Sequence, residues 1–593
     1  MANILTDLIS GQAHKYGDRE AIAFREADDN RDIVLSWQQL SDKVDRLAAA
    51  FIAMGVAEGD SVAIFSPNRP EIVITDFAAF AVRAIPVSIY STSSSEQVEY
   101  IVNDSKASII FTGTKEQYET AIAAKAHCPS LQRVIPYTDI ESEGCKFNDL
   151  LTQPSERDLA EVERRRESAT PDDIATLIYT SGTTGEPKGA VLTHSCFNAV
   201  MEIHRERLTM LSDRDSSVSF LPLSHIFEKA WTYYCLYTGM KIFVNLNPKE
   251  IQATLRRVNP TCMCSVPRFW EKVYTVIQDK MSAMSALRRM LLNRALKIGI
   301  KRNLGYLRKG RRAPLWLEAR YRFYDRQVFG PLRRVIGVDN GNIFPTAGAP
   351  ISDKIVEFMH GCGINIVVGY GLSETAATVT CYPQYGQEIG TVGTVLPRIR
   401  IKIGANGEIL VKGPTVMKGY YNKPEATEEA FTADGWFRTG DAGYINNDGA
   451  LILTERLKDL FKTSNGKYIA PQAIESRLCE DSLIEQVAVI ADKRKFVTAL
   501  IVPAFDKIED YASQVGINFS SREELLQNPD IIKYVEDRIT PLQTGLAPFE
   551  HIKRFTLLPK EFTMESGELT NTLKLRRKVI AEHYAPLIDR MYE

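Results

Sequence analysis

Hydrophobic and polar residues alternate with two different periods along the first two-thirds of the chain. Residues 40–54 place apolar side chains three and four positions apart, which predicts an amphipathic helix. Residues 61–65 form a short apolar run that predicts a buried strand, and residues 71–83 predict a second helix. Because helical and strand-like segments follow one another in this way, we expect an α/β domain with largely parallel sheets.

The pattern changes near residue 399, where short alternating segments replace the longer helical ones. Residues 400–403 and 408–411 flank Asn406 and Gly407, a dipeptide that is typical of the turn in a β-hairpin. A further Gly-containing turn at residues 447–449 separates two more strand-like segments. This stretch therefore predicts a β-rich subdomain in the form of a distorted barrel.

Two other segments carry specific expectations. Residues 153–173 are charged and nearly free of large apolar side chains, so we expect an exposed connector there. Residues 72–90 form the most apolar window, but Asp76 and Arg83 interrupt it. The window is too short and too charged to cross a bilayer, and we interpret it as a buried helix.

Length, composition and charge narrow the class of protein. A chain of 593 residues exceeds what one hydrophobic core usually spans, so at least two domains are expected. The formal net charge of −2 argues against a nucleic-acid-binding protein, which normally carries a strongly basic domain. The nine cysteines are scattered without a C-x-x-C pair, so we expect neither a disulfide framework nor a zinc site. The N-terminus lacks the pattern of a secretory signal, and we expect a cytoplasmic protein.

One segment is strongly basic, although the charge of the whole chain is nearly balanced. Residues 288–334 contain fifteen basic residues, with Glu318 and Asp325 as the only acids. Leu296 and Ile300 belong to a series of apolar residues at helical spacing within it. A basic amphipathic helix can lie on anionic lipid, so peripheral contact with the inner face of a membrane is one interpretation. The other is a solvated helix face that packs on its own domain.

A loop rich in small residues carries the clearest chemical signal. Small residues allow backbone N–H groups to approach phosphate oxygens, hydroxyl groups add donors, and Lys188 adds positive charge. Pro187 before the lysine and Gly189 after it exclude the Walker A motif, and strand-like segments flank the loop on both sides. We therefore expect a strand–loop–strand phosphate site rather than a kinase-like one. Its residues are Thr180, Ser181, Gly182, Thr183, Thr184, Gly185, Glu186, Pro187, Lys188 and Gly189.

Residues 179–189 resemble the signature of the AMP-forming adenylating superfamily, which includes acyl-CoA synthetases, adenylation domains of peptide synthetases, and luciferases. Further blocks of this superfamily follow in order over nearly the whole chain. The resemblance implies an α/β fold with two parallel-rich αβ sheets plus a distorted β-barrel in a large N-terminal domain, residues 1–457. It also implies a small mobile α+β C-terminal domain, residues 458–593, with a hinge at Lys458.

The blocks in the large domain imply roles for individual residues. His225, within residues 220–229, would lie beside the substrate carboxylate and the α-phosphate. Glu374 would hold Mg²⁺ bound to the triphosphate, which suits a cation that takes one or two carboxylates plus phosphates and waters. The adenine would lie against Gly348, Ala349 and Pro350 and stack on Tyr370, which precedes Gly371, and Ser373 would contact phosphate.

The later blocks supply the remaining expected contacts. Asp441 would accept hydrogen bonds from both ribose hydroxyls, as a carboxylate can. Arg456 would contact ribose or phosphate, and Gly466 belongs to a loop that would line the pantetheine channel. Lys574 fits the lysine that catalyses adenylation, because it opens the Lys-x-x-Arg pattern that ends at Arg577.

The resemblance is strongest to long-chain fatty acid:CoA ligases. It rests on residues 221–229 and 265–274, and it implies a long-chain fatty acid, ATP and coenzyme A as substrates with Mg²⁺ as cofactor. Trp231 is off the spacing of the expected gate, so no gate residue is assigned. Two alternatives stay open: a fatty acyl-AMP ligase that delivers to a carrier protein, and a non-catalytic lipid-binding homologue.

Overall fold

The computed structural model describes residues 4–26, 31–142, 144–180, 186–457, 460–464, 467–570 and 574–593. Its largest sheet has six strands in the order β6-β5-β3-β4-β7-β8, parallel throughout except for the antiparallel β7–β8 pair. The bounds are β3 (Ser61–Phe65), β4 (Ile85–Ile89), β5 (Ile109–Thr112), β6 (Arg133–Pro136), β7 (Ile174–Thr180) and β8 (Lys188–Thr193).

Helices cover both faces of this sheet, which is why β3 is buried along its whole length. Val62 and Ile64 of β3 face the core shared with α2 (Trp37–Ala53) and α3 (Pro70–Ala81). Their neighbours Ala63 and Phe65 face the opposite core, shared with α4 (Ser95–Ser105) and α5 (Lys115–Lys125). The predicted helices and the predicted strand are thus confirmed within a few residues. The apolar window at 72–90 is only partly helical, because the chain leaves α3 and enters β4.

The segment at residues 153–173 is largely exposed, as expected of a connector, but its helical conformation was not predicted. Most of it is helix α7 (Glu156–Ser168), whose N-terminus is capped by the Ser155 hydroxyl. Only Val162 of this helix is buried, and Arg165 and Arg166 form ion pairs with carboxylates on α7 and α2. A helix with so little apolar surface has no hydrophobic period to detect, because caps and ion pairs contribute most of its local stability.

A second sheet, β2-β1-β10-β9, contains the strands β1 (Glu20–Phe24), β2 (Ile33–Ser36), β9 (Ser216–Ser219) and β10 (Lys241–Val244). Single β-bridges through Cys262 link β9 to the next sheet, which contains β11 (Phe344–Thr346), β12 (Ile366–Tyr370) and β13 (Thr380–Cys381). The parallel pairing of β11 with β12 brings their carboxyl ends, Thr346 and Tyr370, to one edge.

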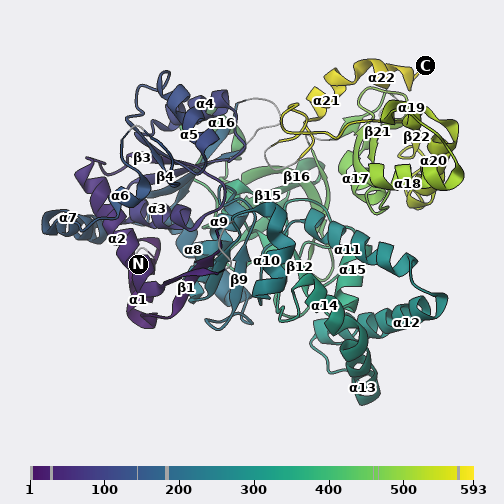
Figure 1. Cartoon of the computed structure of the whole chain (residues 1–593), viewed down its shortest axis with the longest axis horizontal. Coiled ribbons are helices and arrows are strands. Elements are labelled where there is room, and N and C mark those ends of the chain that lie inside the picture. Colours follow the sequence, from purple (N-terminus) through teal and green to yellow (C-terminus); the bar gives the residue numbers. More distant parts are fainter. Residues whose placement is uncertain are drawn as a thin grey trace.

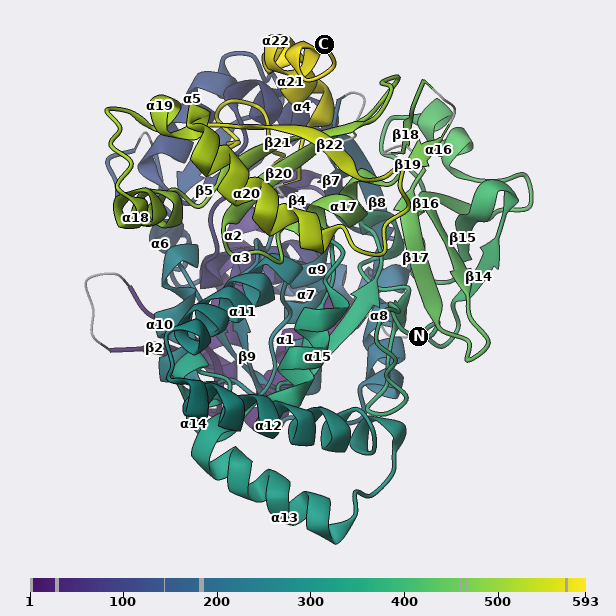
Figure 2. The same cartoon turned by 90° about the vertical axis from the view of Figure 1, so that its right-hand side faces the viewer.

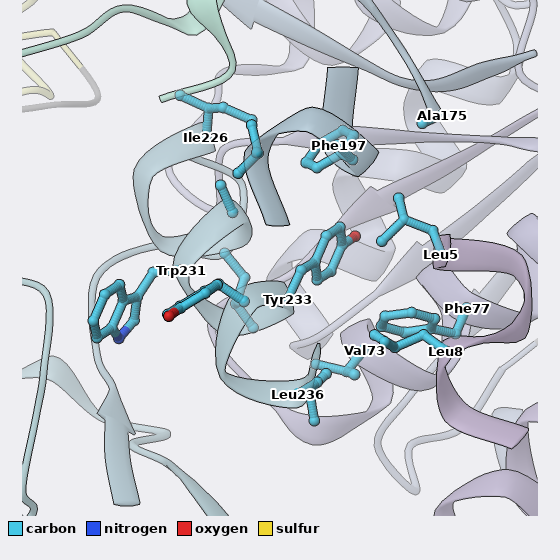
Figure 3. Close-up of a cluster of buried hydrophobic side chains, with 14 of the residues drawn as sticks. Leu5, Leu8, Val73, Phe77, Ala175, Phe197, Ile226, Trp231, Tyr233 and Leu236 are labelled. Carbon is cyan, nitrogen blue, oxygen red and sulfur yellow. The ribbon is translucent and has the colours of Figure 1, made fainter. Parts of the chain in front are cut away.

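A buried cluster between the two main sheets fixes helix α9 (Ile226–Thr238). Figure 3 shows Ile226, Trp231, Tyr233 and Leu236 of α9 together with side chains from other elements. Those partners come from α1 (Ile4–Tyr16), α3, β7 and α8 (His194–Arg207): Leu5, Leu8, Val73, Phe77, Ala175 and Phe197. Because α9 is embedded on nearly all sides, the residue at its N-terminus is held in one position.

The β-rich segment forms a four-stranded antiparallel sheet, β14 (Arg400–Ile403), β15 (Glu408–Lys412), β16 (Phe437–Ile445) and β17 (Leu451–Arg456). The predicted β14–β15 hairpin is confirmed, and both Asn406 and Gly407 have positive φ, at 58° and 74°. These are the left-handed conformations for which Asn and Gly are suited.

The C-terminal part has its own cores and two sheets, β18-β19 and β20-β21-β22. Its strands are β18 (Phe461–Lys462), β19 (Tyr468–Ile469), β20 (Ile484–Ile490), β21 (Val497–Pro503) and β22 (Ile552–Leu557). Its helices are α17 (Pro471–Leu478), α18 (Phe505–Val515), α19 (Arg522–Gln527), α20 (Pro529–Leu542), α21 (Arg577–His583) and α22 (Ala585–Arg590). Two hydrophobic clusters contain only residues of this part. Figure 1 shows it as a separate body beside the rest of the chain.

At the other end of the molecule, two helices form an arm. They are α12 (Ala286–Asn303) and α13 (Leu315–Tyr324), which follow α11 (Pro267–Ser282) and precede α14 (Gly330–Ile336) and α15 (Asp353–Gly361). Figures 1 and 2 both place α13 at the outer edge, opposite α21 and α22. Among the described helices, none combines the length and the apolar character that spanning a bilayer requires.

Candidate active site

The predicted phosphate loop connects β7 to β8. Thr180 pairs with Lys188 in the antiparallel register, so the strands expected on both sides of the loop are confirmed. The Lys188 ammonium lies over the ring of Tyr420, 5.2 Å from its centroid. Residues 417–421 run alongside β8, with hydrogen bonds from Val191 N–H to the Gly419 carbonyl and from Tyr421 N–H to the Gly189 carbonyl. The hairpin therefore presents a lysine next to a second, aromatic segment.

Glu374 lies in a tight turn that faces this segment. The Tyr420 hydroxyl donates a hydrogen bond to Oε1 of Glu374 over 2.9 Å. The turn is compact: Ala376 and Ala377 have positive φ, and a Cβ on Gly371 would stand 1.6 Å from the Ala377 carbonyl oxygen. Gly371 is thus required by this close approach of two backbones.

Tyr370, at the carboxyl end of β12, meets Asp441 from β16. The Tyr370 hydroxyl donates to Oδ2 of Asp441 over 2.7 Å, and Nε of Arg456 lies 3.6 Å from Oδ1. Asp441 and Arg456 are direct partners in the β16–β17 register, which explains their proximity. Burial raises the pKa of Tyr370 well above its usual value, and the Asp441 carboxylate raises it further. Tyr370 is therefore a neutral donor that orients the carboxylate.

Gly348, Ala349 and Pro350 follow β11 at the same edge as Tyr370 and are exposed to solvent. Gly348 adopts φ of 94°, a left-handed conformation that favours glycine, and an added Cβ would have nothing within 4 Å. Ser373 lies in the same turn as Glu374 and is partly exposed. Carboxyl-edge loops of parallel strands are where α/β folds bind ligands.

His225 caps the N-terminus of α9. Its Nδ1 accepts a hydrogen bond from the Phe227 N–H over 3.2 Å. Burial lowers the pKa of His225 to about 4, and the positive charge of Lys574 lowers it further. The ring is therefore neutral at pH 7, and because Nδ1 accepts, its proton is on Nε2. His225 can donate from Nε2 to an oxygen that gains negative charge.

Lys574 reaches this region from the C-terminal part of the chain. Its backbone is held by reciprocal bonds with Thr570: Thr570 N–H donates to the Lys574 carbonyl, and Lys574 N–H donates to the Thr570 hydroxyl. Its ammonium is close enough to His225 to act on the pKa of that ring. The charge of Lys574, from the C-terminal part of the chain, therefore acts on a ring that belongs to the large N-terminal part.

The residues at Glu374 fit a Mg²⁺ ion that also binds phosphates. Among the described residues, no group of three or more His, Cys, Asp or Glu side chains could hold a metal without further ligands. Mg²⁺ usually keeps several waters and takes one or two carboxylates plus substrate phosphates. Glu374 is a partly exposed carboxylate oriented by Tyr420. It matches this incomplete ligand set rather than a permanent metal centre.

Two family models match most of the chain. The family model described as AMP-binding enzyme matches residues 9–421, and that described as AMP-binding enzyme C-terminal domain matches residues 458–593. The chain belongs to the AMP-binding enzyme family.

Relatives of this AMP-binding enzyme match it over almost the full length. Long-chain-fatty-acid–CoA ligase FadD15 of Mycobacterium tuberculosis is 34% identical, over 98% of this chain and 96% of its own. Long-chain-fatty-acid–CoA ligase 1 of Homo sapiens is 30% identical, over 94% of this chain and 82% of its own.

Solved structures of other proteins share the fold of this AMP-binding enzyme. The adenylation domain of a carboxylate reductase from Mycobacterium chelonae superposes with a TM-score of 0.76 at 21% identity, covering 99% of this chain and 91% of that one. The O-succinylbenzoate coenzyme A synthetase of Bacillus subtilis in complex with AMP superposes with a TM-score of 0.67 at 21% identity, covering 97% of each chain. The expected α/β fold with a smaller C-terminal domain is thus confirmed.

Sequence reasoning missed Tyr420 in this AMP-binding enzyme. Tyr420 touches both Lys188 and Glu374, two of the predicted site residues. The available signal was Gly419-Tyr420-Tyr421, a glycine followed by two aromatic residues in an otherwise polar stretch. Several predicted site residues lie outside the described residues: Ser181, Gly182, Thr183, Thr184, Gly185, Lys458 and Gly466. Their roles, like the individual roles of the others, stay predictions.

Proposed function

We propose that this chain is an AMP-forming long-chain fatty acid:CoA ligase. It would adenylate a fatty carboxylate with ATP, release pyrophosphate, and then transfer the acyl group to coenzyme A with release of AMP. The observation that carries the proposal is the cluster of Tyr370, Asp441 and Arg456, in which the Tyr370 hydroxyl lies 2.7 Å and Nε of Arg456 3.6 Å from the Asp441 carboxylate. Full-length similarity to ligases named for long-chain fatty acids supports the choice of substrate.

In the first step, a carboxylate oxygen attacks the α-phosphorus of ATP, a P–O bond forms, and pyrophosphate leaves with the electrons of the broken P–O bond. Negative charge gathers around phosphorus, so positioned cations and donors supply most of the catalysis. Lys574 and Lys188 would supply positive charge, and Nε2–H of His225 would donate a hydrogen bond. When bound at Glu374, Mg²⁺ would neutralise charge on the phosphates.

Other residues would hold the nucleotide during this step. Asp441 would accept hydrogen bonds from the ribose hydroxyls while Tyr370 keeps the carboxylate oriented. Arg456, beside Asp441, would contact ribose or phosphate. Gly348, Ala349 and Pro350 would lie against the adenine, and Ser373 would contact phosphate.

In the second step, the thiol of coenzyme A attacks the acyl carbonyl and AMP leaves. We propose that residues 458–593 present Lys574 for adenylation and then rotate at Lys458 to admit coenzyme A. Closure that assembles the site and excludes water also protects the reactive anhydride from hydrolysis.

The decisive experiment is a panel of fatty acids from short to long chains, scored for AMP release with and without coenzyme A. Coenzyme A-dependent release of AMP that is largest for long chains supports the proposal. Acyl-adenylate that accumulates and is released only by a carrier protein would establish the fatty acyl-AMP ligase instead. Pyrophosphate release that responds to no fatty acid would establish a non-catalytic homologue.

We also propose that the enzyme works in the cytoplasm, at the surface of a membrane. All nine cysteines are free thiols, which suits a reducing compartment. Long-chain fatty acids partition into bilayers, so a ligase at the membrane surface would meet its substrate there. The basic segment 288–334 is the candidate for this contact.

A further inference from the structure

The arm formed by α12 and α13 exposes several large apolar side chains. Leu287 is 63% exposed, Met290 59%, Trp316 49% and Phe323 62%. Single exposed apolar residues are ordinary on soluble proteins. A group of them on one element is different, because contiguous apolar surface normally marks a contact with another molecule or with lipid.

On α12 the exposed apolar residues share one helical face. The opposite face is buried, since Leu292 and Leu296 belong to the same hydrophobic cluster as Trp270. The exposed stripe is therefore what remains after α12 has packed on its own domain. Its members recur at spacings of three and four, which places them in one row. They are Leu287, Met290, Leu291, Arg294 and Lys301, with the partly buried Ile298 in the same row.

A matching stripe on α13 continues this surface. Trp316, Arg320 and Phe323 follow one another at spacings of four and three. Lys301 of α12 lies 5.1 Å from the Trp316 ring centroid, and Arg320 lies 5.4 Å from it. A shallow groove between the helices is lined by Arg294, Ile298, Ala319, Arg320, Phe323 and Tyr324. We call the two stripes and this groove the arm surface.

The charge of the arm selects an anionic partner. Residues 288–334 contain fifteen basic residues and only two acids, whereas the whole chain has a formal net charge of −2. Both acids are already paired: Glu318 with Arg302 at 2.9 Å, and Asp325 with Arg333 at 2.8 Å. Arg294, Lys301 and Arg320 are exposed on the arm surface itself. The local potential is therefore positive next to apolar and aromatic side chains.

We propose that the arm surface docks on an anionic lipid bilayer, with α12 and α13 lying in the plane of the interface. Leucine, methionine and phenylalanine side chains would enter the boundary between headgroups and acyl chains, and Trp316 suits the interfacial layer. Arginine and lysine stems would extend to lipid phosphates. Both views place α13 at the outer end of the molecule, opposite α21 and α22, where a flat surface can approach it (Figures 1 and 2). The proposal rests on the membrane contact proposed above and specifies its residues and its lipid, and vesicle binding tests it without reference to activity.

The test is co-sedimentation of the full-length protein with vesicles of phosphatidylcholine alone or of an equal mixture with phosphatidylglycerol. The wild-type protein should pellet with the anionic vesicles and be released by high salt. Arg294→Glu/Arg320→Glu should lower the vesicle partition coefficient at least ~20-fold, since two favourable cations become two repelled anions. Lys115→Glu/Lys533→Glu makes the same change in net charge on exposed helices elsewhere and should still pellet.

A second variant, with its own control, tests the apolar side chains of the arm surface. Trp316→Ala/Phe323→Ala should weaken vesicle binding several-fold at constant charge, whereas Phe549→Ala, an exposed aromatic residue in the C-terminal part, should not. In the wild-type protein, anionic vesicles should shift the tryptophan emission to shorter wavelength, and Trp316→Phe should remove that shift. Equal binding to neutral vesicles, or binding that survives both arm variants, overturns the proposal. So does an arm variant that changes the molar mass in sedimentation velocity without vesicles, because that result assigns the surface to a second copy of the chain.

Discussion

Arg268 and Glu485 form an ion pair between the large and small parts of the chain. Nη2 of Arg268 lies 2.6 Å from Oε1 of Glu485 and also donates to the Glu485 main-chain carbonyl over 2.9 Å. Arg268 is in the first turn of α11, and Glu485 is in β20. A second contact, from the Ser352 hydroxyl to the Glu480 carboxylate, lies nearby in the same boundary. These bonds exist in the arrangement that brings Lys574 close to His225, so they favour the adenylation step.

Arg268→Glu should slow adenylation more than thioester formation. The reversed charge repels Glu485 and disfavours the arrangement with Lys574 near His225, by ~1 kcal/mol for a pair that is about one-third exposed. We expect pyrophosphate exchange to fall about fivefold, with thioester formation from supplied acyl-adenylate unchanged or faster. Arg268→Glu/Glu485→Arg should restore exchange, and Lys533→Glu should leave it unchanged. Failure of the double variant to restore exchange would argue that Arg268 acts in some other way.

Lys574→Ala should abolish adenylation and spare thioester formation. Removing a cation from the region where charge develops should slow the first step by a factor of ~100 or more. The measurement is fatty-acid-dependent pyrophosphate exchange, compared with coenzyme A consumption from synthetic acyl-adenylate. Lys578→Ala, an exposed lysine in the same basic run, is the matched control. An equal loss of both steps would remove Lys574 from its proposed role.

Tyr420→Phe should raise KM for ATP in the presence of Mg²⁺ about tenfold. The substitution removes the hydrogen bond to Glu374 but keeps the ring under Lys188. A hydrogen bond to a charged group contributes about 1.5–3 kcal/mol, which is enough free energy for a tenfold change in KM. Tyr421→Phe serves as control because it makes the same change at the neighbouring residue. An ATP titration at fixed Mg²⁺ that gives equal KM values for both variants would contradict the role of Tyr420.

Lys229→Met should destabilise the large domain by about 3–5 kcal/mol. Lys229 and Asp76 form a fully buried ion pair, with Nζ and Oδ2 2.5 Å apart, and the Tyr233 hydroxyl donates to the same Oδ2 over 2.8 Å. Losing the lysine leaves the Asp76 carboxylate buried without its cation. Urea unfolding followed by tryptophan fluorescence measures the loss, and Asp76→Asn/Lys229→Met should recover most of it. If the double variant is no more stable than the single one, the penalty does not come from the unpaired carboxylate.

Stability should decrease as the pH falls below about 6.5. Burial lowers the pKa of His194 to about 4 and that of His360 to about 3, in the latter case with a further contribution from Arg308. Between these values and the usual pKa of 6.5, the unfolded chain binds more protons than the folded one, so acid favours unfolding. Each residue should cost about 1.4 kcal/mol per pH unit below 6.5, until its folded pKa is reached. Urea midpoints at pH 7 and pH 5 check this, and His360→Gln should reduce the difference between them.

Local pattern alone determined several elements of the fold, whereas the site residues came from the resemblance to a family. The strand at residues 61–65, the hairpin around Asn406 and Gly407, and the strand–loop–strand form of the phosphate loop all follow from neighbouring residues. Each depends on side-chain period, on the φ values open to Asn and Gly, or on the absence of a helix after Pro187. Such preferences act over a few residues and can therefore be read without the rest of the chain.

The tertiary structure determined which of these segments contact one another. The hydrogen bonds of Tyr420 to Glu374 and of Tyr370 to Asp441 join residues far apart in the sequence. No local period encodes such pairs, because they form only when sheets and domains pack. Helix α7 was missed for the related reason that caps and ion pairs, rather than an apolar stripe, define it. The basic residues and the helical spacing of apolar residues at 288–334 left two interpretations open. Only the burial of one face of α12 in the structure showed which side chains remain exposed for a partner.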